Sequence, residues 1–599
     1  MEKWLCDVET FPNFFCVGLK KFAEKERKYF EISEYRDDRE ELRNFFFNYK
    51  DFLITFNGID YDVPMILYAI KNKHVTNQQL KDFSDHIINN EYWRYEYNMK
   101  IYSKQYWWKD LDLFLYWSLK TRQERKISLK GLGISMKYPV VQELPYDPST
   151  YLTPEQIKEV REYNEIHDLG ILELLTAKKE EEIRLRVYLY NTYKLKCLSE
   201  DAIKIATMFL LKDYCSITKS DPNVVYNLRF QQEDIPDLSD VNPQFKTKEL
   251  IDIFEHTKRT GELKANFMLF NLPLSMGSGG IHSVNKYEIY SASKDVYLIT
   301  SDARSLYPTL IENWKLLRFH EVLERYTKTK VERFEAKAAK EVIKDAFFKL
   351  ILNGVSGLLD LEYSWLNYPE NALKMRFIGQ FLIAKLCEEV SLHKFTVVSA
   401  NTDGVEVLVP KHRLEEYFDI VKSIEHIFNV EFEHEYYKKI YYQSVNDYIA
   451  VYDNDKKEPK LKGSFLINPP IEYSSDFLVV PKSLVEHVIK GVSPTYFIKQ
   501  HKDILDFCAS QKVGKNYEII YDGEKQQRLN RYYASMSGAF LYKLKKETGR
   551  KTHMLKSSGV KIYNNHNPEI FPKDINYNFY IQQVNNILNQ FYNKQQTLF

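Results

Sequence analysis

The segment FTVVSANTDGVEVLV, residues 395–409, joins two short apolar runs by a polar NTDG turn at 401–404. After the turn Val405, Val407 and Val409 recur at every second position. That alternation places the three valines on one face of a strand, and an Asp-Gly pair supplies the positive φ that a tight hairpin needs. The segment therefore predicts two antiparallel strands with a carboxylate at their turn. Such a turn is common by itself, so its meaning depends on companions elsewhere in the chain.

Two companions lie upstream. LITSDARSLYPTLI, residues 298–311, places Asp302 at the end of an apolar run. KLILNGVSG, residues 349–357, has helical character, with Lys349 and Asn353 one turn apart. The order DxxSLYP, KxxxNxxxG and TDG resembles motifs A, B and C of family B DNA polymerases. By its size, the chain is most similar to phage-encoded members.

The resemblance implies a nucleotidyl-transfer centre. In-line attack by a primer 3′ oxygen on an α-phosphate needs metal ions and cations around the triphosphate. Asp302 and Asp403 are the implied metal ligands, with the Ala303 carbonyl as a further one. Asn401 stands where the family usually has a first aspartate, which leaves Asp403 as the essential carboxylate. Tyr307 is the implied steric gate against a ribose 2′-OH.

A short finger hairpin of two helices is expected between motifs A and B, residues 316–357. Lys349 is expected to reach the triphosphate, and Asn353 to pack beneath the nascent base pair. A second lysine one turn earlier is usual in the family, but Asp345 stands there. Arg325 and Lys328 share a face of the first helix and are candidates for phosphate contacts; a solvated charged face explains them equally well.

The N-terminal region contains a second set of carboxylates. Asp7 and Glu9 lie two apart in an alternating apolar run, so both point to one face of a strand. Asp62 follows a second strand-like run, and Asp168 lies in a helical pattern. The set resembles the Asp-Glu-Asp-Asp 3′–5′ exonuclease of the same enzymes, in which the four carboxylates would hold two metal ions about 4 Å apart.

The spacing of Tyr163 departs from the family. The usual tyrosine lies four residues before the last aspartate, whereas Tyr163 lies five before Asp168. Five is the spacing of histidine-type relatives, so the role of Tyr163 in catalysis stays open, and a decayed exonuclease is the main alternative. Because the first motif starts at residue 7, no separate N-terminal domain is expected to precede it.

Several short motifs suggest contacts with nucleic acid. Gly279 and Gly280 resemble the YxGG/A element near the template, although its tyrosine is absent and a plain glycine-rich loop is an alternative. Lys439 and Tyr441 resemble the KxY element at the primer terminus. The later KG element is matched by Lys462 and Gly463.

The final region carries a basic segment. From 524 to 556 it holds nine Lys/Arg against two Glu, interleaved with aromatic residues. Arg528 and Arg531 are the cations expected to grip the duplex backbone, and binding there should weaken with salt. Helical patterns predict a mainly helical thumb over 479–599.

Bulk properties agree with a multidomain enzyme. At 599 residues the chain can form three or four domains, and 44% hydrophobic and 28% charged residues indicate a globular protein. No apolar run reaches membrane-spanning length and no signal peptide is evident, so no membrane partner is expected. Six scattered cysteines without CxxC spacing favour a reducing cytoplasm, that of the host cell for a phage protein, and argue against structural zinc.

The expected fold is α/β and α+β multidomain, an RNase H-like exonuclease followed by a right-hand polymerase. The expected regions are exonuclease 1–185, connector and start of palm 186–295, palm with motif A 296–315, fingers 316–357, palm with motif C 358–478, and thumb 479–599. The resemblance implies primer-template DNA and deoxynucleoside triphosphates as substrates. It also implies two Mg²⁺ per active site, replaceable by Mn²⁺. A monomer is expected, assisted by replication accessory proteins.

Two further alternatives remain. Protein-primed phage relatives carry a sizeable insertion between motifs A and B, whereas the interval from Thr309 to Phe348 is only 40 residues. Two helices of roughly 15 residues with a turn would fill it, so a nucleic-acid primer is expected. A non-catalytic nucleic-acid-binding protein would have to retain all six acidic residues by chance.

Overall fold

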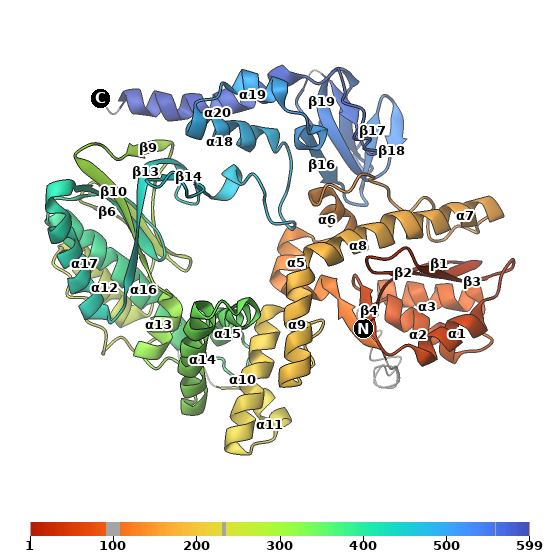
Figure 1. Ribbon diagram of the computed structural model, residues 1–599, viewed down its shortest axis with the longest axis horizontal. Helices are drawn as coiled ribbons and strands as arrows, with labels where there is room; N and C mark the ends of the chain where they lie inside the picture. Colours follow the sequence, from red (N-terminus) through yellow and green to blue (C-terminus); the bar gives the residue numbers. More distant parts are fainter. Residues whose placement is uncertain (1, 91–107, 231–234, 558, 598–599) are drawn as a thin grey trace. The chain divides into compact units, whose positions relative to one another are not determined.

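The computed structural model describes residues 2–90, 108–230, 235–557 and 559–597. By their internal contacts these residues form two compact units (Figure 1). The first comprises Met1–Ala202, Pro469–Val479 and Gln500–Tyr580. The second comprises Ile203–Asn468, Val480–Lys499 and Ile581–Phe599. The region expected to be a thumb, 479–599, is thus divided between both units.

A mixed five-stranded sheet organises the first unit, in the order β3-β2-β1-β4-β5. Pairing is antiparallel from β3 to β1 and parallel from β1 to β5. The strands are β1 (Lys3–Phe11), β2 (Phe14–Lys21), β3 (Arg27–Ser33), β4 (Phe52–Thr55) and β5 (Lys109–Asp112). Apolar clusters cover the sheet on both faces, which explains why β2 is buried almost throughout.

Helices of this unit pack on the sheet or extend from it (Figure 1). They are α1 (Arg39–Asn48), α2 (Asp62–Lys71), α3 (Asn77–Asn89), α5 (Leu119–Arg125), α6 (Leu129–Ser135), α7 (Pro154–Tyr163), α8 (Leu169–Lys178) and α9 (Glu180–Tyr193). Between α7 and α8 the chain forms one π-helical turn, Asn164–Asp168. That turn positions a predicted site residue, as described below.

A seven-stranded antiparallel sheet organises the second unit. Its order is β11-β12-β10-β13-β14-β15, with β9 also paired to β13. The strands are β9 (Glu288–Ser291), β10 (Val296–Ala303), β11 (Thr396–Ala400), β12 (Gly404–Pro410), β13 (Phe432–Ser444), β14 (Asp447–Tyr452) and β15 (Lys460–Leu461). The hairpin predicted from residues 395–409 is confirmed as β11 and β12, and the strand-turn-strand pattern after it as β13 and β14.

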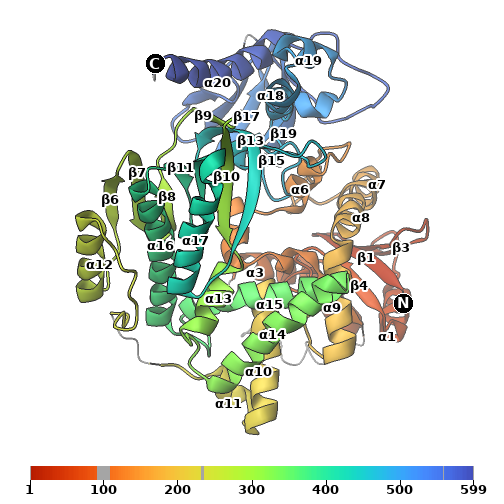
Figure 2. The same ribbon diagram turned by 60° about the vertical axis from the view of Figure 1, so that its left-hand side comes forward.

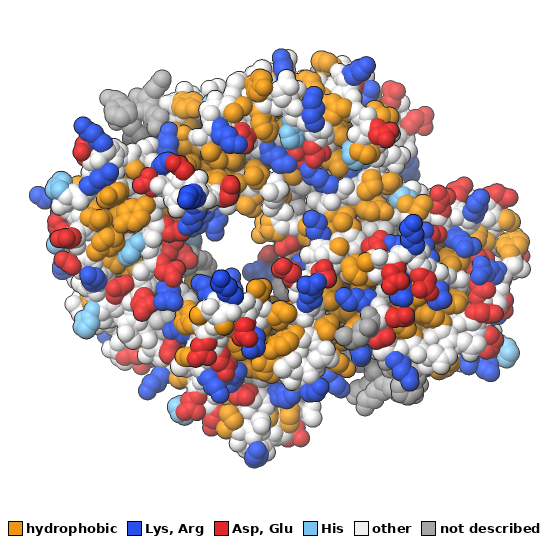
Figure 3. All heavy atoms as spheres, in the orientation of Figure 1, with side chains coloured by type: hydrophobic (Ala, Val, Ile, Leu, Met, Phe, Trp, Pro, Cys, Tyr) orange, Lys and Arg blue, Asp and Glu red, His pale blue; other side chains and the backbone are white. Residues whose placement is uncertain are grey.

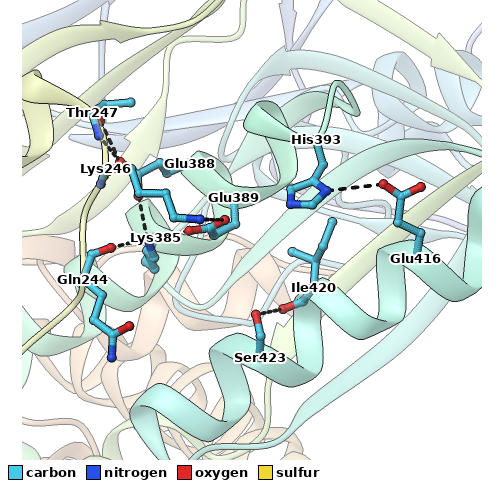
Figure 4. Close-up of polar contacts among 10 residues, drawn as sticks. All are labelled: Gln244, Lys246, Thr247, Lys385, Glu388, Glu389, His393, Glu416, Ile420 and Ser423. Carbon is cyan, nitrogen blue, oxygen red and sulfur yellow. Dashed lines mark hydrogen bonds and ion pairs between the residues drawn. The ribbon is translucent and has the colours of Figure 1, made fainter.

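Helices α16 (Pro369–Leu392) and α17 (Leu414–Phe428) lie side by side along this sheet (Figure 2). A buried ionic cluster joins α16 to the chain before α12 (Lys248–Thr260) (Figure 4). The Glu388 carboxylate accepts hydrogen bonds from the Lys246 and Thr247 backbone amides and from the Thr247 hydroxyl, while Lys385 forms ion pairs with Glu388 and Glu389. The cluster supplies acceptors for amides at the start of α12 and is therefore structural.

The two helices predicted between motifs A and B are confirmed as α14 (His320–Ala338) and α15 (Val342–Asp360), which pack together. The short α13 (Leu306–Asn313) follows β10 directly. Other helices of this unit are α10 (Ala202–Thr218), α11 (Pro222–Tyr226), α18 (Val479–Lys490) and α19 (Pro494–Gln500). A small three-stranded sheet contains β6 (Ala265–Leu269), β7 (Leu272–Gly277) and β8 (Gly280–Ser283).

The mainly helical thumb predicted for 479–599 is wrong in its central part. Between α19 and α20 (Tyr577–Thr597) the chain forms seven strands in two small sheets, grouped with the first unit. They are β16 (Cys508–Lys512), β17 (Tyr517–Tyr521), β18 (Glu524–Gln526), β19 (Leu529–Ala539), β20 (Leu541–Lys545), β21 (Lys551–His553) and β22 (Val560–Ile562). Alternation in 517–521 carries a strand signal, because Tyr517, Ile519 and Tyr521 all belong to the core between the sheets.

All six cysteines are buried and free. None of the helices within the described ranges combines the length and apolar character needed to cross a bilayer. Basic and acidic side chains are interspersed on the face shown in Figure 3. This agrees with a net charge of only +1.

Candidate active sites

Three carboxylates come together at β1. Asp7 and Glu9 point from the same face of the strand, and Asp168 reaches them from the end of the π-helical turn. One ligand oxygen of each lies within 4.8 Å of the others. The side chains of a distant helix and a strand thus converge on one point, as the exonuclease resemblance requires.

The π-helical turn explains the spacing of Tyr163. The Leu169 amide donates to the Asn164 carbonyl, five residues back, so this turn is wider by one residue than an α-helical turn. The extra residue brings Tyr163 toward the face of Asp168, although the two are five positions apart. Tyr163 is 1% exposed, and burial, then the charge of Asp168, raises the pKa of its phenol.

Electrostatic repulsion dominates this cluster. Burial, and then the neighbouring Asp168, raises the pKa values of both Asp7 and Glu9 well above their usual range. Among the described residues, the one cation in contact with these carboxylates is Lys130 of α6. Its Nζ lies 3.6 Å from Asp168 and 5.0 Å from the centre of the Tyr163 ring. Burial opposes the charge of Lys130, but the carboxylates outweigh it and raise the pKa of this lysine. The three crowded carboxylates are oxygen donors that fit divalent cations, and one lysine balances only part of their negative charge.

The fourth predicted carboxylate, Asp62, lies outside this trio. It begins α2 and is 4% exposed. Burial, and then the charge of Asp112, raises the pKa of Asp62 to about 8. Asp62 is nevertheless close enough to the trio to contribute to the raised pKa values of Asp7 and Glu9.

A glycine opposite Asp7 creates space for a further polar side chain. In the β1–β2 pairing Asp7 faces Gly18, and a Cβ at Gly18 would overlap with the Asn164 amide. Asn164 uses this space to donate from Nδ2 to Asp7 Oδ2 at 2.6 Å. This hydrogen bond orients Asp7 without adding negative charge.

The second centre lies where β10 ends beside the β11–β12 turn. Strand pairing places Asp302 opposite Gly404, and the Ala303 amide donates to the Asp403 carbonyl at 2.7 Å. Asp302 and Asp403 are therefore neighbours through backbone register. The Asn401 side chain accepts from the Asp403 and Gly404 amides, each at 3.0 Å. Asn401 thus shapes the turn, a role that does not need the carboxylate usual in the family.

The Asp302 carboxylate lies over Gly404. A Cβ at Gly404 would overlap with Asp302 Oδ1. Gly404 therefore leaves room for the opposing carboxylate. The positive φ predicted for the Asp-Gly pair is wrong, because neither Asp403 nor Gly404 has one; the hydrogen bonds to Asn401 hold the turn instead. Any larger residue at 404 must move Asp302.

A buried glutamate lies behind Asp302. Glu406 is 6% exposed and faces Thr300 across the β10–β12 pair. The Thr300 hydroxyl lies 3.4 Å from Asp302 Oδ1 and 3.4 Å from Glu406 Oε1. Burial, and then the charge of Asp302, raises the pKa of Glu406 to about 8.

Lys460 is the cation that faces Asp302. Its Nζ lies 3.9 Å from Asp302 Oδ2, and it extends from the edge strand β15. Burial raises the pKa of Asp302, Lys460 opposes the shift, and Asp403 adds to it. As at the first centre, negative charge exceeds positive charge, which fits divalent cations.

Tyr307 lies near the second centre. It belongs to α13, and its ring approaches the Cα of Gly379 on α16. Burial raises the pKa of Tyr307, Arg376 opposes the shift, and Asp403 contributes a smaller rise. Tyr307 therefore lies within electrostatic range of Asp403.

The finger residues fall into two groups. Lys349 and Asn353 lie exposed on one face of α15. Lys328 is also exposed, on α14. Arg325 is not available as predicted: its guanidinium donates twice to Glu332 and stacks on the Phe209 ring at 4.8 Å. The ion pair and the ring use the surface that a phosphate would need.

A pocket of about 520 Å³ lies beside α13. Arg304, Ser305 and Lys330 contribute to its lining. Lys330 of α14 forms an ion pair with Glu312 at 2.7 Å. Lys330 is a finger-helix cation next to motif A that the spacing of Arg325 and Lys328 did not reveal.

The proposed KxY element lies on the wrong face of the sheet. Leu298, on the face of Asp302, clusters with Ile440, Tyr442 and Tyr448. A register shift between Tyr437 and Lys439 reverses the alternation, so Lys439 and Tyr441 point to the other face. There Lys439 lies over the Tyr441 ring, and Tyr441 packs on Phe591. Tyr448, whose pKa is raised by burial and then by the charges of Glu406, Asp302 and Asp403, lies on the face of the carboxylates instead.

The glycine motifs are placed by close approaches. Gly280 has φ +115°, and a Cβ there would overlap with the Thr402 hydroxyl of the NTDG turn, whereas Gly279 is open. Gly463, at φ +60°, lies against Asp447. Lys462 is exposed beside it. Of the four, Gly280 alone touches the motif C turn within the described contacts.

The two arginines of the basic segment have structural partners. Arg531 is 2% exposed, and its guanidinium donates to the carbonyls of Tyr138, Pro139 and Tyr563. Arg531 cannot also grip DNA, so that prediction is wrong. Arg528 donates its amide to Glu143, with the guanidinium 3.9 Å from the same carboxylate. The charges of the two arginines are evident in the sequence, but the backbone carbonyls and the Glu143 carboxylate that pair with them are far away in the chain.

Sequence reasoning missed five residues at the two centres: Lys130, Asn164, Thr300, Glu406 and Lys460. Glu406 carried the clearest signal, because a charged residue inside the buried run VEVLV contradicts its surroundings. Lys460 is separated from Asp302 by more than 150 residues, and no local pattern links them.

No protein-family model matches the chain, and no curated protein matches it. Among solved structures, the chain is similar to the family B DNA polymerase from the hyperthermophilic archaeon Pyrobaculum calidifontis. The similarity has a TM-score of 0.43 at 12% sequence identity and covers 99% of this chain and 78% of the other.

Proposed function

We propose that this protein is a DNA-directed DNA polymerase of family B with a 3′–5′ proofreading exonuclease, of the type encoded by phages. The observation that carries the proposal is the presence of two carboxylate centres in two different sheets. One unites Asp7, Glu9 and Asp168, and the other pairs Asp302 with Asp403 through strand register. The motif order in the sequence assigns hydrolysis to the first and nucleotidyl transfer to the second.

At the polymerase centre, Asp302, Asp403 and the Ala303 carbonyl would hold two Mg²⁺. Bound there, the ions supply Lewis acidity for attack on the α-phosphate. Lys460 limits the repulsion between the carboxylates before ions and nucleotide bind. Lys349 offers a cation for the triphosphate, Asn353 lies one turn beyond Lys349, and Tyr307 selects the sugar.

At the exonuclease centre, Asp7, Glu9, Asp62 and Asp168 would hold two divalent ions that supply a hydroxide and stabilise the leaving oxygen. Asn164 orients Asp7, and Lys130 supplies a counter-charge to Asp168. The π-helical turn supports an active exonuclease over a decayed one, because it returns Tyr163 to the face that the family spacing would use.

The test is a pair of assays with purified protein and Mg²⁺. A 5′-labelled primer on a template should be extended with all four deoxynucleoside triphosphates, and single strands should be shortened from the 3′ end without them. Asp403→Ala should reduce extension on the order of a thousandfold or more and leave degradation intact; Asp7→Ala with Glu9→Ala should do the reverse. Asp522→Ala, another aspartate in an Asp-Gly hairpin turn, is the matched control. Loss of both activities in one folded variant would contradict the assignment.

Initiation is expected from an ordinary nucleic-acid primer. Helices α14 and α15 occupy most of the interval between motifs A and B, which leaves no space for a further folded insertion. Purified protein should extend DNA or RNA primers without a terminal protein. Failure on every such primer, with nucleotide joined instead to a protein hydroxyl, would reverse this conclusion.

A further inference from the structure

The two C-terminal sheets pack face to face around a small core. One sheet has the order β16-β19-β22 and the other β18-β17-β20-β21. Ile519 and Leu541 of the four-stranded sheet are fully buried, and they cluster with Tyr532 and Val560 of the other sheet. Side chains alternate between the two faces of a sheet. The residues next to Ile519 and Leu541 on the four-stranded sheet must therefore point away from the core.

The outward face of the four-stranded sheet is a set of aligned rows. Register places Lys525, Ile520, Tyr542 and His553 side by side across all four strands. A second row contains Glu518, Leu544 and Lys551. Phe540, two positions before Tyr542, is 53% exposed. We call Phe540, Tyr542, Leu544, Ile520, Lys525, Lys551 and His553 the outward face.

Aromatic rings and cations are interleaved on this face. The Lys551 Nζ lies 5.0 Å from the centre of the Tyr542 ring, and the rings of Phe540 and His553 are 5.2 Å apart. Its rows contain one carboxylate, Glu518, which forms an ion pair with Lys525 at 2.8 Å. The adjoining turn 546–550 adds the exposed cations Lys546 and Arg550.

The chain before Phe540 is held firmly in place. The Asp574 carboxylate accepts hydrogen bonds from the hydroxyls of Tyr533, Ser535 and Ser537, each within 3.0 Å, and pairs with Lys561. This anchor lies within three residues of Phe540. The informative feature is that Phe540 lies next to Tyr542 and His553, so that several rings form one contiguous exposed patch.

We propose that the outward face binds single-stranded DNA, with bases stacked on Phe540 and Tyr542 and phosphates held by Lys525 and Lys551. Sheets that combine aromatic rings with cations bind single strands, because an unpaired base can offer its ring face to a side chain. Bases in a duplex are already stacked on their neighbours, so a duplex would use only the cations. That the nucleic acid is DNA rests on the proposed function.

The test combines binding with mapping. Fluorescence anisotropy should follow a labelled oligothymidylate of about 12 nucleotides and, separately, a duplex of the same length. Phe540→Ala with Tyr542→Ala should weaken single-strand binding about tenfold or more and change duplex binding less than twofold. Tyr151→Ala, which removes a 66% exposed tyrosine elsewhere in the first unit, is the matched control.

A second pair of variants tests the charges. Lys525→Ala with Lys551→Ala should lower the slope of log affinity against log salt by about 1.4, since each single-strand phosphate contact contributes about 0.7. Lys158→Ala, at an exposed lysine of α7, should leave the slope unchanged. The side chains of Phe540, Tyr542, Lys525 and Lys551 all lie outside the core, so the thermal unfolding temperature of both variants should match that of the parent protein.

Photocrosslinking with 5-iododeoxyuridine locates the bound strand. Adducts within 540–553 support the proposal. Unchanged affinity in the aromatic variant, equal weakening of duplex binding, or adducts only elsewhere would overturn it. A protein that crosslinks there but neither extends nor degrades DNA would refute the proposed function alone. One that does both but crosslinks elsewhere would refute only this surface.

Discussion

Both carboxylate centres are built against a glycine on the neighbouring strand, but the two glycines make room for different groups. Opposite Asp7, Gly18 admits the Asn164 amide, which arrives from a helical segment 157 residues away. Opposite Asp302, Gly404 admits the Asp302 carboxylate itself. The first centre therefore depends on packing between distant segments, and the second on the register of one strand pair.

This difference predicts how each centre fails. A change at the second centre acts directly on a metal-ligand candidate through the backbone. A change at the first can act through a supporting residue and should be milder. The four predictions below test this contrast, from the largest expected effect to the smallest.

The largest effect is expected from Gly404→Ala. The new methyl group must displace the Asp302 carboxylate, and a misplacement of about 1 Å can reduce a rate on the order of a hundredfold. Primer extension should fall by that factor, whereas single-strand degradation should not change. Gly277→Ala is the control, because a Cβ there also meets open space and Gly277 is not a predicted contact. Equal loss in both variants would show that Asp302 is not specifically displaced.

Sugar selection should belong to the second centre alone. Tyr307→Ala should open space for a 2′-OH and raise ribonucleotide incorporation relative to deoxynucleotide by about 10- to 100-fold in the ratio of kcat/KM. Degradation of single-stranded DNA should be unchanged. An active variant with an unaltered ratio would remove the steric-gate role from Tyr307.

The buried Glu406 should make stability depend on pH. Its folded-state pKa of about 8 lies above the ordinary value of 4.5, so the folded state binds the proton more tightly. The stabilisation is complete below about pH 4.5 and is lost as pH rises toward 8. Between pH 6 and pH 8 the free energy of unfolding should fall by about 2 kcal/mol more than in Glu406→Gln.

Chemical denaturation without divalent ions measures this difference. Glu415→Gln, at an exposed glutamate of α17, is the control. Parallel pH profiles for the parent protein and Glu406→Gln would mean that Glu406 is ionised in the folded state.

The mildest effect is expected from Asn164→Ala. Loss of one hydrogen bond to Asp7 should slow degradation by about 5- to 10-fold without affecting primer extension. Asn164→Asp should be worse than Asn164→Ala, because it adds a fourth negative charge next to three. Steady-state degradation rates for the two variants decide the point. Equal rates would show that the amide only fills space beside Gly18.

Local patterns in the sequence were enough to predict the elements that carry the carboxylates. Strand alternation predicted that Asp7 and Glu9 share a face, and the Asp-Gly turn predicted the hairpin at Asp403. The pair of finger helices followed from helical periodicity in 320–353. These features depend on backbone geometry within a few residues, and that geometry is the same whatever the rest of the fold is.

Other predictions failed where one local irregularity changed a long stretch. A single register shift before Lys439 reversed the face of the following side chains, so Tyr448 replaced Tyr441 near the carboxylates. The basic segment was predicted to be helical and to bind the duplex backbone, yet it forms strands. The guanidinium of Arg531 is hydrogen-bonded to backbone carbonyls. A bulge or a buried acceptor leaves no periodic trace in the sequence.

The sequence by itself determined which carboxylates exist, on which elements, and in what chain order, because 2.0- and 3.6-residue periods set those relations. Tertiary structure alone decided which groups surround them: Lys130 and Asn164 at one centre, Thr300, Glu406 and Lys460 at the other. It also decided that Gln500–Tyr580 belongs to the same compact unit as Met1–Ala202. Such contacts join residues far apart in the chain, and they are selected by the complementary shape and charge of folded surfaces, which no short window of sequence contains.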